Sequence, residues 1–342
     1  MSSGGNMGKN GSKQLDRAVL FSVSHGIWMI FLVIFVIGLI FIPGFAKFSN
    51  IVNVMWGNVS FGFLVLGMFI VLLTGQTDLS IESTFAIAPI MGAIMMLNWF
   101  PKVVSPSFAI LIVLVTGCLV GFINSLLSVY LEINSFLVTL TMLLVLRGMS
   151  EYIIPEGLYY LPETFIALGN QKIGGFPIAL GIFIILAITL LILTRKTEFG
   201  KNLYATGSSE RAAYLAGVDV KKVKTIAFIL SGFFAALGGL TSAGRMQAVT
   251  ADMGSGDVMT VFAACFLGGA SMSGGKGDVV DLIGAILTLS IITNILNLRG
   301  VNPFLINVIY GLILLFAIVF AKFQQVVRQN MLIKIASCHE NA

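Results

Sequence analysis

TRKTEFGKNLYATGSSERAAYLAGVDVKKVKTI, residues 194–226, is the only long polar stretch of an otherwise apolar chain. This stretch, called the polar island below, holds seven basic residues against three acidic ones. Short loops rich in Lys and Arg stay on the cytoplasmic side of a membrane. We therefore predict that the polar island is cytoplasmic and that it sets the orientation of the rest of the chain.

The middle of the polar island predicts a short capped helix. Ser208 or Ser209 can accept a hydrogen bond from the free N–H groups of the first turn, and Glu210 stands where the helix dipole favours an acid. Gly217 can supply the left-handed residue that ends such a helix. We expect a helix of roughly two turns on the cytoplasmic face.

The composition places the remainder in a membrane. Hydrophobic residues make up 57% of the chain and charged residues 10%, against about 25% charged residues in soluble domains. The formal net charge of +5 comes from loops and tails, so we interpret it as membrane topology and predict no nucleic-acid partner. Cys118, Cys265 and Cys338 have no paired spacing, and neither a disulfide framework nor a metal site is predicted.

Ten transmembrane helices are predicted, because a span needs about 20 apolar residues. Even numbers of spans separate the polar island from both basic tails, so both termini are expected to be cytoplasmic. The chain then divides into a disordered tail over 1–20, a membrane domain over 21–323 that contains the polar loop 195–224, and a tail over 324–342. The predicted spans lie near 22–42, 51–74, 81–98, 104–128, 134–150, 176–194, 223–242, 256–269, 279–297 and 303–322.

Two Gly-rich polar breaks interrupt the apolar runs: TGQTDLSIES at 74–83 and LGGASMSGGKGDVVD at 267–281. Asp78 is expected to cap the helix that follows the first break. Paired breaks of this kind predict an internal repeat of the transporter type, and two ordinary loops are the alternative. The glycines expected to shape the backbone are Gly75, Gly268, Gly269, Gly274, Gly275 and Gly277.

Nothing in the sequence predicts an enzyme. The strings SGGNMGKN and SGGKGD fail the spacing of a phosphate loop, in which four residues separate a first Gly from the Gly-Lys pair and Ser or Thr follows the pair. His25 and His339 are the only histidines, and no nucleophile-and-base set is present. We therefore expect no catalytic residue and no cofactor in this chain.

Polar side chains inside the apolar runs must face protein or water, because exposing them to lipid is costly. Amides and hydroxyls suit a path for a neutral polyol, whereas helix-to-helix hydrogen bonds are the alternative for each residue. The absence of an acidic relay through the span centres argues against proton coupling. The residues predicted to line a translocation path are Asp78, Ser80, Asn124, Asn134, Thr139, Asn294 and Asn297.

Several ordered motifs resemble the permease subunits of bacterial ATP-binding cassette importers, in the ribose and simple-sugar branch. FGKNLYATGSSERAAYLAGVDVKKVK is similar to their cytoplasmic loop, and TGQTDLSIES to their TGGIDLSVGS. GFINSLLSVYLEINSFLVTLTM, LGGASMSGGKGDVVDLIGA and TNILNLRGV follow in the family's order, and the likeness covers about residues 50 to 320.

The resemblance implies an all-α permease of the inner membrane, embedded in lipid and paired with a second permease chain, identical or not. It implies separate cassette ATPase subunits, which carry ATP and Mg, and a periplasmic solute-binding protein that delivers a monosaccharide. The residues that would couple to the ATPase are Ser209, Glu210, Arg211, Ala212, Ala213, Ala216 and Gly217.

Departures from the family's pattern leave the solute open. Gln76 and Glu82 replace Gly, Glu132 stands where a basic residue is common, and Arg299 replaces Leu. The alternative function is a secondary transporter or channel that works without ATP. Such a protein predicts an intramembrane ion site and has no need of a helix over 200–217.

Overall fold

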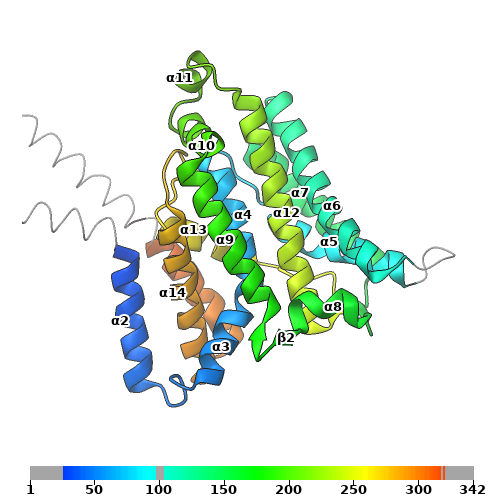
Figure 1. The fold of residues 1–342 in the computed structure, drawn as a ribbon, viewed down its shortest axis with the longest axis vertical. Coiled ribbons are helices and arrows are strands. Elements are labelled where there is room, and N and C mark those ends of the chain that lie inside the picture. Colours follow the sequence, from blue (N-terminus) through cyan, green and yellow to red (C-terminus); the bar gives the residue numbers. More distant parts are fainter. Residues whose placement is uncertain (1–25, 98–103, 317–318, 320–342) are drawn as a thin grey trace, which may run out of the picture.

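The computed structural model describes residues 26–97, 104–316 and 319, and this part of the chain is a bundle of helices with two small antiparallel strand pairs (Figure 1). Strands β1 (Leu158–Tyr159) and β4 (Ala248–Val249) form one pair, and β2 (Lys172–Ile173) and β3 (Phe176–Pro177) form the other. The helices are α2 (Gly26–Phe41), α3 (Phe48–Gly57), α4 (Val59–Leu73), α5 (Ile81–Met96), α6 (Pro106–Ser125), the π-helical turn η1 (Leu126–Tyr130), α7 (Ser135–Ile153), α8 (Glu163–Asn170), α9 (Ile178–Lys196), α10 (Glu198–Ser208), α11 (Glu210–Leu215), α12 (Val220–Met246), α13 (Asp257–Leu267), α14 (Val279–Leu298) and a last helix Pro303–Phe316.

Five helices among the described residues are long and apolar enough to cross a membrane, and α3 with α4 makes a sixth if the pair, bent by 42°, is one span. All six coincide with predicted spans, so the chain is an all-α polytopic membrane protein. The other four predicted spans correspond to shorter apolar helices: α2, α5, α13 and Pro303–Phe316. The count of ten therefore stays a prediction, and the tails 1–20 and 324–342 lie outside the described residues.

Helix α12 is the centre of the bundle. In its most apolar window 72% of the residues are buried inside the chain, against 22% in α7. Glycines let α12 approach its neighbours backbone to backbone: a Cβ on Gly121 of α6 would overlap the carbonyl oxygen of Phe228, and one on Gly239 would overlap that of Phe85. Small residues at crossing points are typical of helix packing in membranes. Helix α7, by contrast, leaves most of its surface for lipid or a partner.

The bundle has two distinct ends. Helices α10 and α11 lie together at one end, called the island end below, and α3, α8 and β2 lie at the other (Figure 1). Helix α9 leads into the polar island and helix α12 leads out of it, and both helices run between the two ends of the bundle. The polar island therefore folds as a compact cap on one end of the bundle.

Candidate functional site

A buried carboxylate organises the first Gly-rich break. The side chain of Asp78 is 1% exposed and accepts hydrogen bonds from Ser80 Oγ at 2.6 Å and from Ser231 Oγ at 2.7 Å. Asn124 Nδ2 donates to Ser80 Oγ at 2.7 Å and lies 3.4 Å from Asp78 Oδ1. The break, α6 and α12 are thus joined by one polar cluster, called the Asp78 cluster below.

The Asp78 cluster corrects one prediction and leaves one atom without a partner. Asp78 is not the N-cap of α5: the helix begins at Ile81, Ser80 holds the cap position, and no side chain caps the first turn. The carboxylate is turned instead towards the hydroxyls of Ser80 and Ser231. The buried Asn124 Oδ1 has no hydrogen-bond partner among the described residues, which is rare for a buried amide.

Thr139 extends this polar region along α7. Its Oγ1 donates to the carbonyl oxygen of Ser135 at 2.7 Å and lies 3.4 Å from that of Thr77. The backbone N–H of Thr77 donates to Ser135 Oγ at 3.2 Å. The structure therefore brings together four of the predicted path residues, namely Asp78, Ser80, Asn124 and Thr139.

The other three predicted path residues lie elsewhere. Asn134 is exposed and caps α7 by accepting from the N–H of Phe136 at 2.9 Å. Asn294 exchanges two hydrogen bonds of 3.0 Å with Asn50 and so joins α14 to α3. Asn297 is exposed near the end of α14. The sequence did not reveal this separation. The position of a polar residue within an apolar run does not show which face of the helix it occupies or which helix packs there.

Close to the Asp78 cluster, an ion pair joins four segments. Arg147 Nη2 lies 3.2 Å from Glu82 Oε1, with side chains 13% and 7% exposed. Arg147 Nη1 donates to the carbonyl oxygens of Ala251 at 2.5 Å and Met253 at 3.1 Å. Glu82 Oε2 accepts from the N–H of Val258 in the first turn of α13 at 3.2 Å. One guanidinium and one carboxylate thus hold α5, α7, α13 and the segment 250–256 together, and we call this arrangement the Glu82–Arg147 clasp.

The clasp contains charges that sequence reasoning missed. The sequence pattern indicated amides and hydroxyls for the path and no acidic relay through the span centres, but it did not pair Glu82 with Arg147, and these two residues meet across 65 positions of the sequence. The signal was available in two places. Glu82 departs from the family's Gly, and Arg147 interrupts an apolar run. An Arg inside an apolar run requires an acidic or carbonyl partner nearby.

Two other departures from the family pattern also have partners. Glu132 Oε1 lies 3.5 Å from Lys221 Nζ, an exposed pair near the start of α12. Arg299 Nη2 donates to the carbonyl oxygen of Phe41 at 2.8 Å and so links the end of α14 to that of α2. These residues tie segments of the chain to one another.

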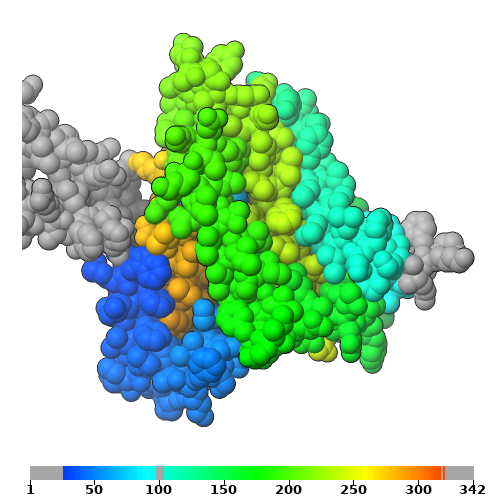
Figure 2. Space-filling view, in the orientation of Figure 1, coloured from blue at the N-terminus to red at the C-terminus, as the bar shows by residue number. Residues whose placement is uncertain are grey.

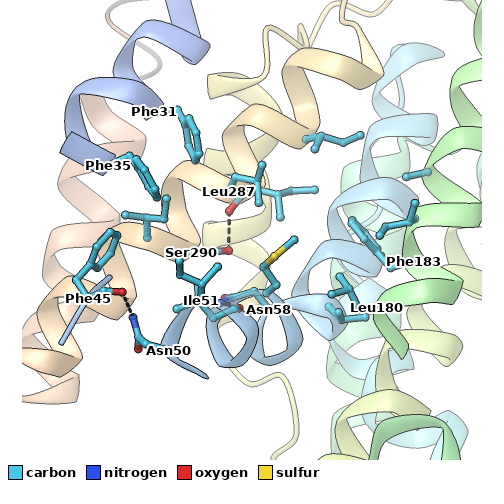
Figure 3. Close-up of a pocket in the computed structure, with 18 of the residues that line it drawn as sticks. Phe31, Phe35, Phe45, Asn50, Ile51, Asn58, Leu180, Phe183, Leu287 and Ser290 are labelled. Atoms are coloured by element: carbon cyan, nitrogen blue, oxygen red, sulfur yellow. Dashed lines mark hydrogen bonds between the residues drawn. The ribbon is translucent and has the colours of Figure 1, made fainter. Parts of the chain in front are cut away.

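A cavity of about 320 Å³ lies between α2, α3, α9 and α14 (Figure 3). Phe31 and Phe35 point into it from one side, and Leu180 and Phe183 line the opposite side. In the space-filling view, α14 is visible between the blue α2–α3 segment and the green α9 (Figure 2). The lining of the cavity is almost entirely apolar, so the cavity offers few hydrogen-bond partners to the hydroxyl groups of a polar solute.

The short helix expected in the polar island is α11, Glu210–Leu215. Ser209 Oγ accepts from the N–H of Ala212 at 3.3 Å, and Gly217 ends the helix with φ of +85°. Glu210 Oε2 lies 2.6 Å from Lys224 Nζ, which fixes α11 to the N-terminal part of α12. Ala213 is buried, whereas Arg211, Ala212 and Ala216 are exposed.

Helix α11 presents two bulky side chains to solvent. Tyr214 is 72% exposed and Leu215 is 77% exposed. Tyr214 and Leu215 are neighbours in the chain, and contiguous exposed apolar surface is typical of interaction sites. The geometry therefore favours a protein partner at the tip of the island end.

Helix α10 was not predicted. Thr197 caps it by accepting from the N–H of Gly200 at 3.2 Å, and Glu198 stands in its first turn, so a cap signal was present in the sequence. Tyr204 Oη donates to the carbonyl oxygen of Gly277 at 2.8 Å. Burial raises the pKa of Tyr204 to about 12, with a smaller contribution from the Asp278 carboxylate.

The glycines of the two breaks occupy special backbone positions. Gly75, Gly269, Gly274, Gly275 and Gly277 have φ between +67° and +134°, a region that favours glycine. Gly268 has ordinary backbone angles, but a Cβ on it would lie 2.7 Å from the Cα of Leu282. Steric limits thus explain all six.

Comparison with known proteins decides the family. Residues 50–320 match the family described as "Branched-chain amino acid transport system / permease component". The chain belongs to this permease family. The permease is 33% identical over 313 residues to the L-arabinose transport system permease protein AraH of Escherichia coli (strain K12), with 90% of this chain and 93% of that protein covered. The resemblance found in the sequence is thereby confirmed.

Two further relatives are similar along most of the permease. The galactose/methyl galactoside import permease protein MglC of Escherichia coli (strain K12) is 29% identical, with 86% of this chain and 92% of that protein covered. The ribose import permease protein RbsC of Bacillus subtilis (strain 168) is 30% identical, with 81% and 85% covered. No solved structure matches the permease.

Proposed function

We propose that this permease is the membrane subunit of an ATP-driven importer and that it forms the translocation path for a monosaccharide. Its similar relatives are permeases named for arabinose, galactose and ribose, and the match covers most of each chain. The observation that carries the proposal is the pairing of this family likeness with a protruding, capped helix that exposes Tyr214 and Leu215. ATP and Mg belong to a separate ATPase subunit.

The island end is proposed to face the cytoplasm. Its side of the bundle carries the exposed basic residues Lys201, Arg211, Lys221 and Lys222, and such residues are retained on the inner side of the membrane. With ten spans, both termini lie on that side as well. The residues 151–175, which carry three Glu and one Lys, then lie outside, where a solute-binding protein delivers the sugar.

A second permease chain is proposed to complete the path. The exposed apolar face of α7, which includes Leu144, Val145 and Met149, offers one surface for it or for lipid. In this structure the Asp78 cluster is closed and buried, so these polar groups would meet solute only after the helices move. ATP-driven movement of α11 would supply that change as a rigid-body displacement.

The docking role of α11 is tested by co-purification. The permease is expressed with its cassette ATPase, and Tyr214→Asp is compared with Tyr160→Asp, which replaces a tyrosine that is 99% exposed outside the polar island. We expect Tyr214→Asp to lose the ATPase and Tyr160→Asp to retain it, because a charge placed in an apolar interface is costly. Equal retention by both variants would contradict docking at α11. Sugar uptake without any ATPase would instead indicate the ATP-independent carrier.

A further inference from the structure

We propose that Gly207, near the end of α10, is the positioning residue through which movement of the polar island reaches both breaks of the membrane domain. This inference rests on the proposed function, in which an ATPase displaces α11. It adds the physical link between the docking helix and the interrupted helices. The link is a contact of three backbones without intervening side chains.

The first contact is with the end of α4. A Cβ on Gly207 would overlap the carbonyl oxygen of Leu73, so only hydrogen fits between the two backbones. Leu73 is the last residue of α4 and directly precedes the first break. A displacement of Gly207 therefore acts on the point where α4 leads into the break.

The second contact of Gly207 is with the second break, next to the carbonyl oxygen of Leu73. The N–H of Gly275 donates to the carbonyl oxygen of Leu73 at 2.9 Å. A Cβ on Gly274 would lie 2.6 Å from the N of Gly75 and 2.9 Å from the Cα of Gly207. We call Gly75, Gly207, Gly274 and Gly275 the glycine junction. The two breaks, which are far apart in the sequence, thus touch each other and α10 at once.

Two side-chain contacts near the island end hold α9 and α10 to the second break. Tyr204 Oη donates to the carbonyl oxygen of Gly277. Arg195, at the end of α9, donates to Asp278 Oδ2 from Nη2 at 2.7 Å and from Nε at 3.1 Å. Asp278 Oδ1 in turn accepts from the N–H of Val280 and caps α14. Movement of α10 is thereby passed to the start of α14.

The glycine junction is suited to transmit movement because it is rigid. Long side chains absorb a small displacement by changing rotamer, whereas backbones in van der Waals contact move together, and close-packed interiors transmit strain. Leu73, whose carbonyl oxygen contacts Gly207 and Gly275, is separated from Asp78 by only four residues. On the other side of the junction, α13 leads into the second break. The junction therefore lies between the docking helix and the Asp78 cluster.

The test uses the full complex of permease, ATPase and solute-binding protein in proteoliposomes. Gly207→Ala is compared with Gly311→Ala, a helical glycine of the last helix, Pro303–Phe316, whose added Cβ meets no atom within 4 Å. The amount of bound ATPase, ATP hydrolysis and sugar uptake are measured for each. We expect Gly207→Ala to bind ATPase normally and to lose about tenfold in sugar imported per ATP hydrolysed, which is within the range by which mutations between two coupled sites change their coupling. Gly311→Ala is expected to match the wild type.

A second variant covers the case in which Gly207→Ala does not fold. Tyr204→Phe removes only the hydroxyl that binds Gly277, and we expect it to lower sugar imported per ATP while leaving ATPase binding unchanged. A purely structural role would lower the amount of complex and leave that ratio intact. Wild-type ratios in the folded variants would overturn this inference alone. Failure of the wild-type permease to bind the ATPase would overturn the proposed function as well.

Discussion

The two Gly-rich breaks look alike in the sequence, but the structure holds them in different ways. The first, at 74–83, is fixed by charged and polar side chains: Asp78 binds Ser80 and Ser231, and Glu82 binds Arg147. The second, at 267–281, is fixed near the island end by glycine backbones and by contacts with α9 and α10. Apart from Gly75, which belongs to the glycine junction, the first break is thus sensitive to loss of a charge or hydrogen bond, and the second mainly to the addition of volume.

The largest expected effect comes from breaking the Glu82–Arg147 clasp. Arg147→Met leaves the buried Glu82 carboxylate without its partner and frees the carbonyl oxygens of Ala251 and Met253. Removing one member of a buried pair costs about 3–5 kcal/mol. We expect a marked fall in the unfolding temperature of the purified permease in detergent. An unchanged unfolding temperature would show that the clasp does not hold the first break.

A smaller loss is expected from Asp78→Asn, which keeps the shape of the side chain. The amide keeps only one acceptor oxygen and carries no charge, so the bonds that Ser80 and Ser231 donate to a carboxylate are lost or weakened. Hydrogen bonds to charged groups contribute about 1.5–3 kcal/mol. The exposed Asp252→Asn serves as the control, and the two are compared by thermal unfolding. Equal stability of the two variants would argue against a structural role for the Asp78 carboxylate.

The second break is tested by two glycines with the same backbone strain. Gly274 and Gly269 have φ of +77° and +80°, but an added Cβ meets Gly75 and Gly207 only at position 274. We expect Gly274→Ala to be less stable than Gly269→Ala by about 1–3 kcal/mol, the typical cost of overpacking. The difference in unfolding temperature measures the contact alone. If the two alanine variants unfold together, the glycine junction is not close-packed.

The smallest effect is expected at the Arg195–Asp278 pair. The two side chains are 51% and 33% exposed, so solvent screens their attraction. Arg195→Met should change the unfolding free energy by about 1 kcal/mol or less. The comparison with Arg147→Met, the same substitution at a buried pair, shows how far burial decides the result. A loss as large as that of Arg147→Met would mean that the second break also depends on charge.

The sequence predicted what depends on local pattern. Long apolar runs indicated α6, α9 and α12, and the Ser209 and Gly217 signals indicated α11. These features follow from residues that are neighbours in the chain.

Contacts between distant residues could not be predicted in this way. The span expected at 51–74 is two helices that bend at Asn58, and Glu82 finds Arg147 through the packing of α5 on α7. The glycine junction likewise needs three chain segments to meet. The sequence pattern predicted that glycines shape the backbone at the two breaks, and only the fold shows which residues lie against them.

The most direct test of the account is sugar uptake by proteoliposomes that contain the permease, its ATPase and its solute-binding protein. Labelled L-arabinose, galactose and ribose are supplied outside, with ATP present or absent inside. We predict that at least one of these sugars accumulates only when ATP, the ATPase and the binding protein are all present. Equal uptake by the permease alone, without ATP or partner proteins, would contradict the account.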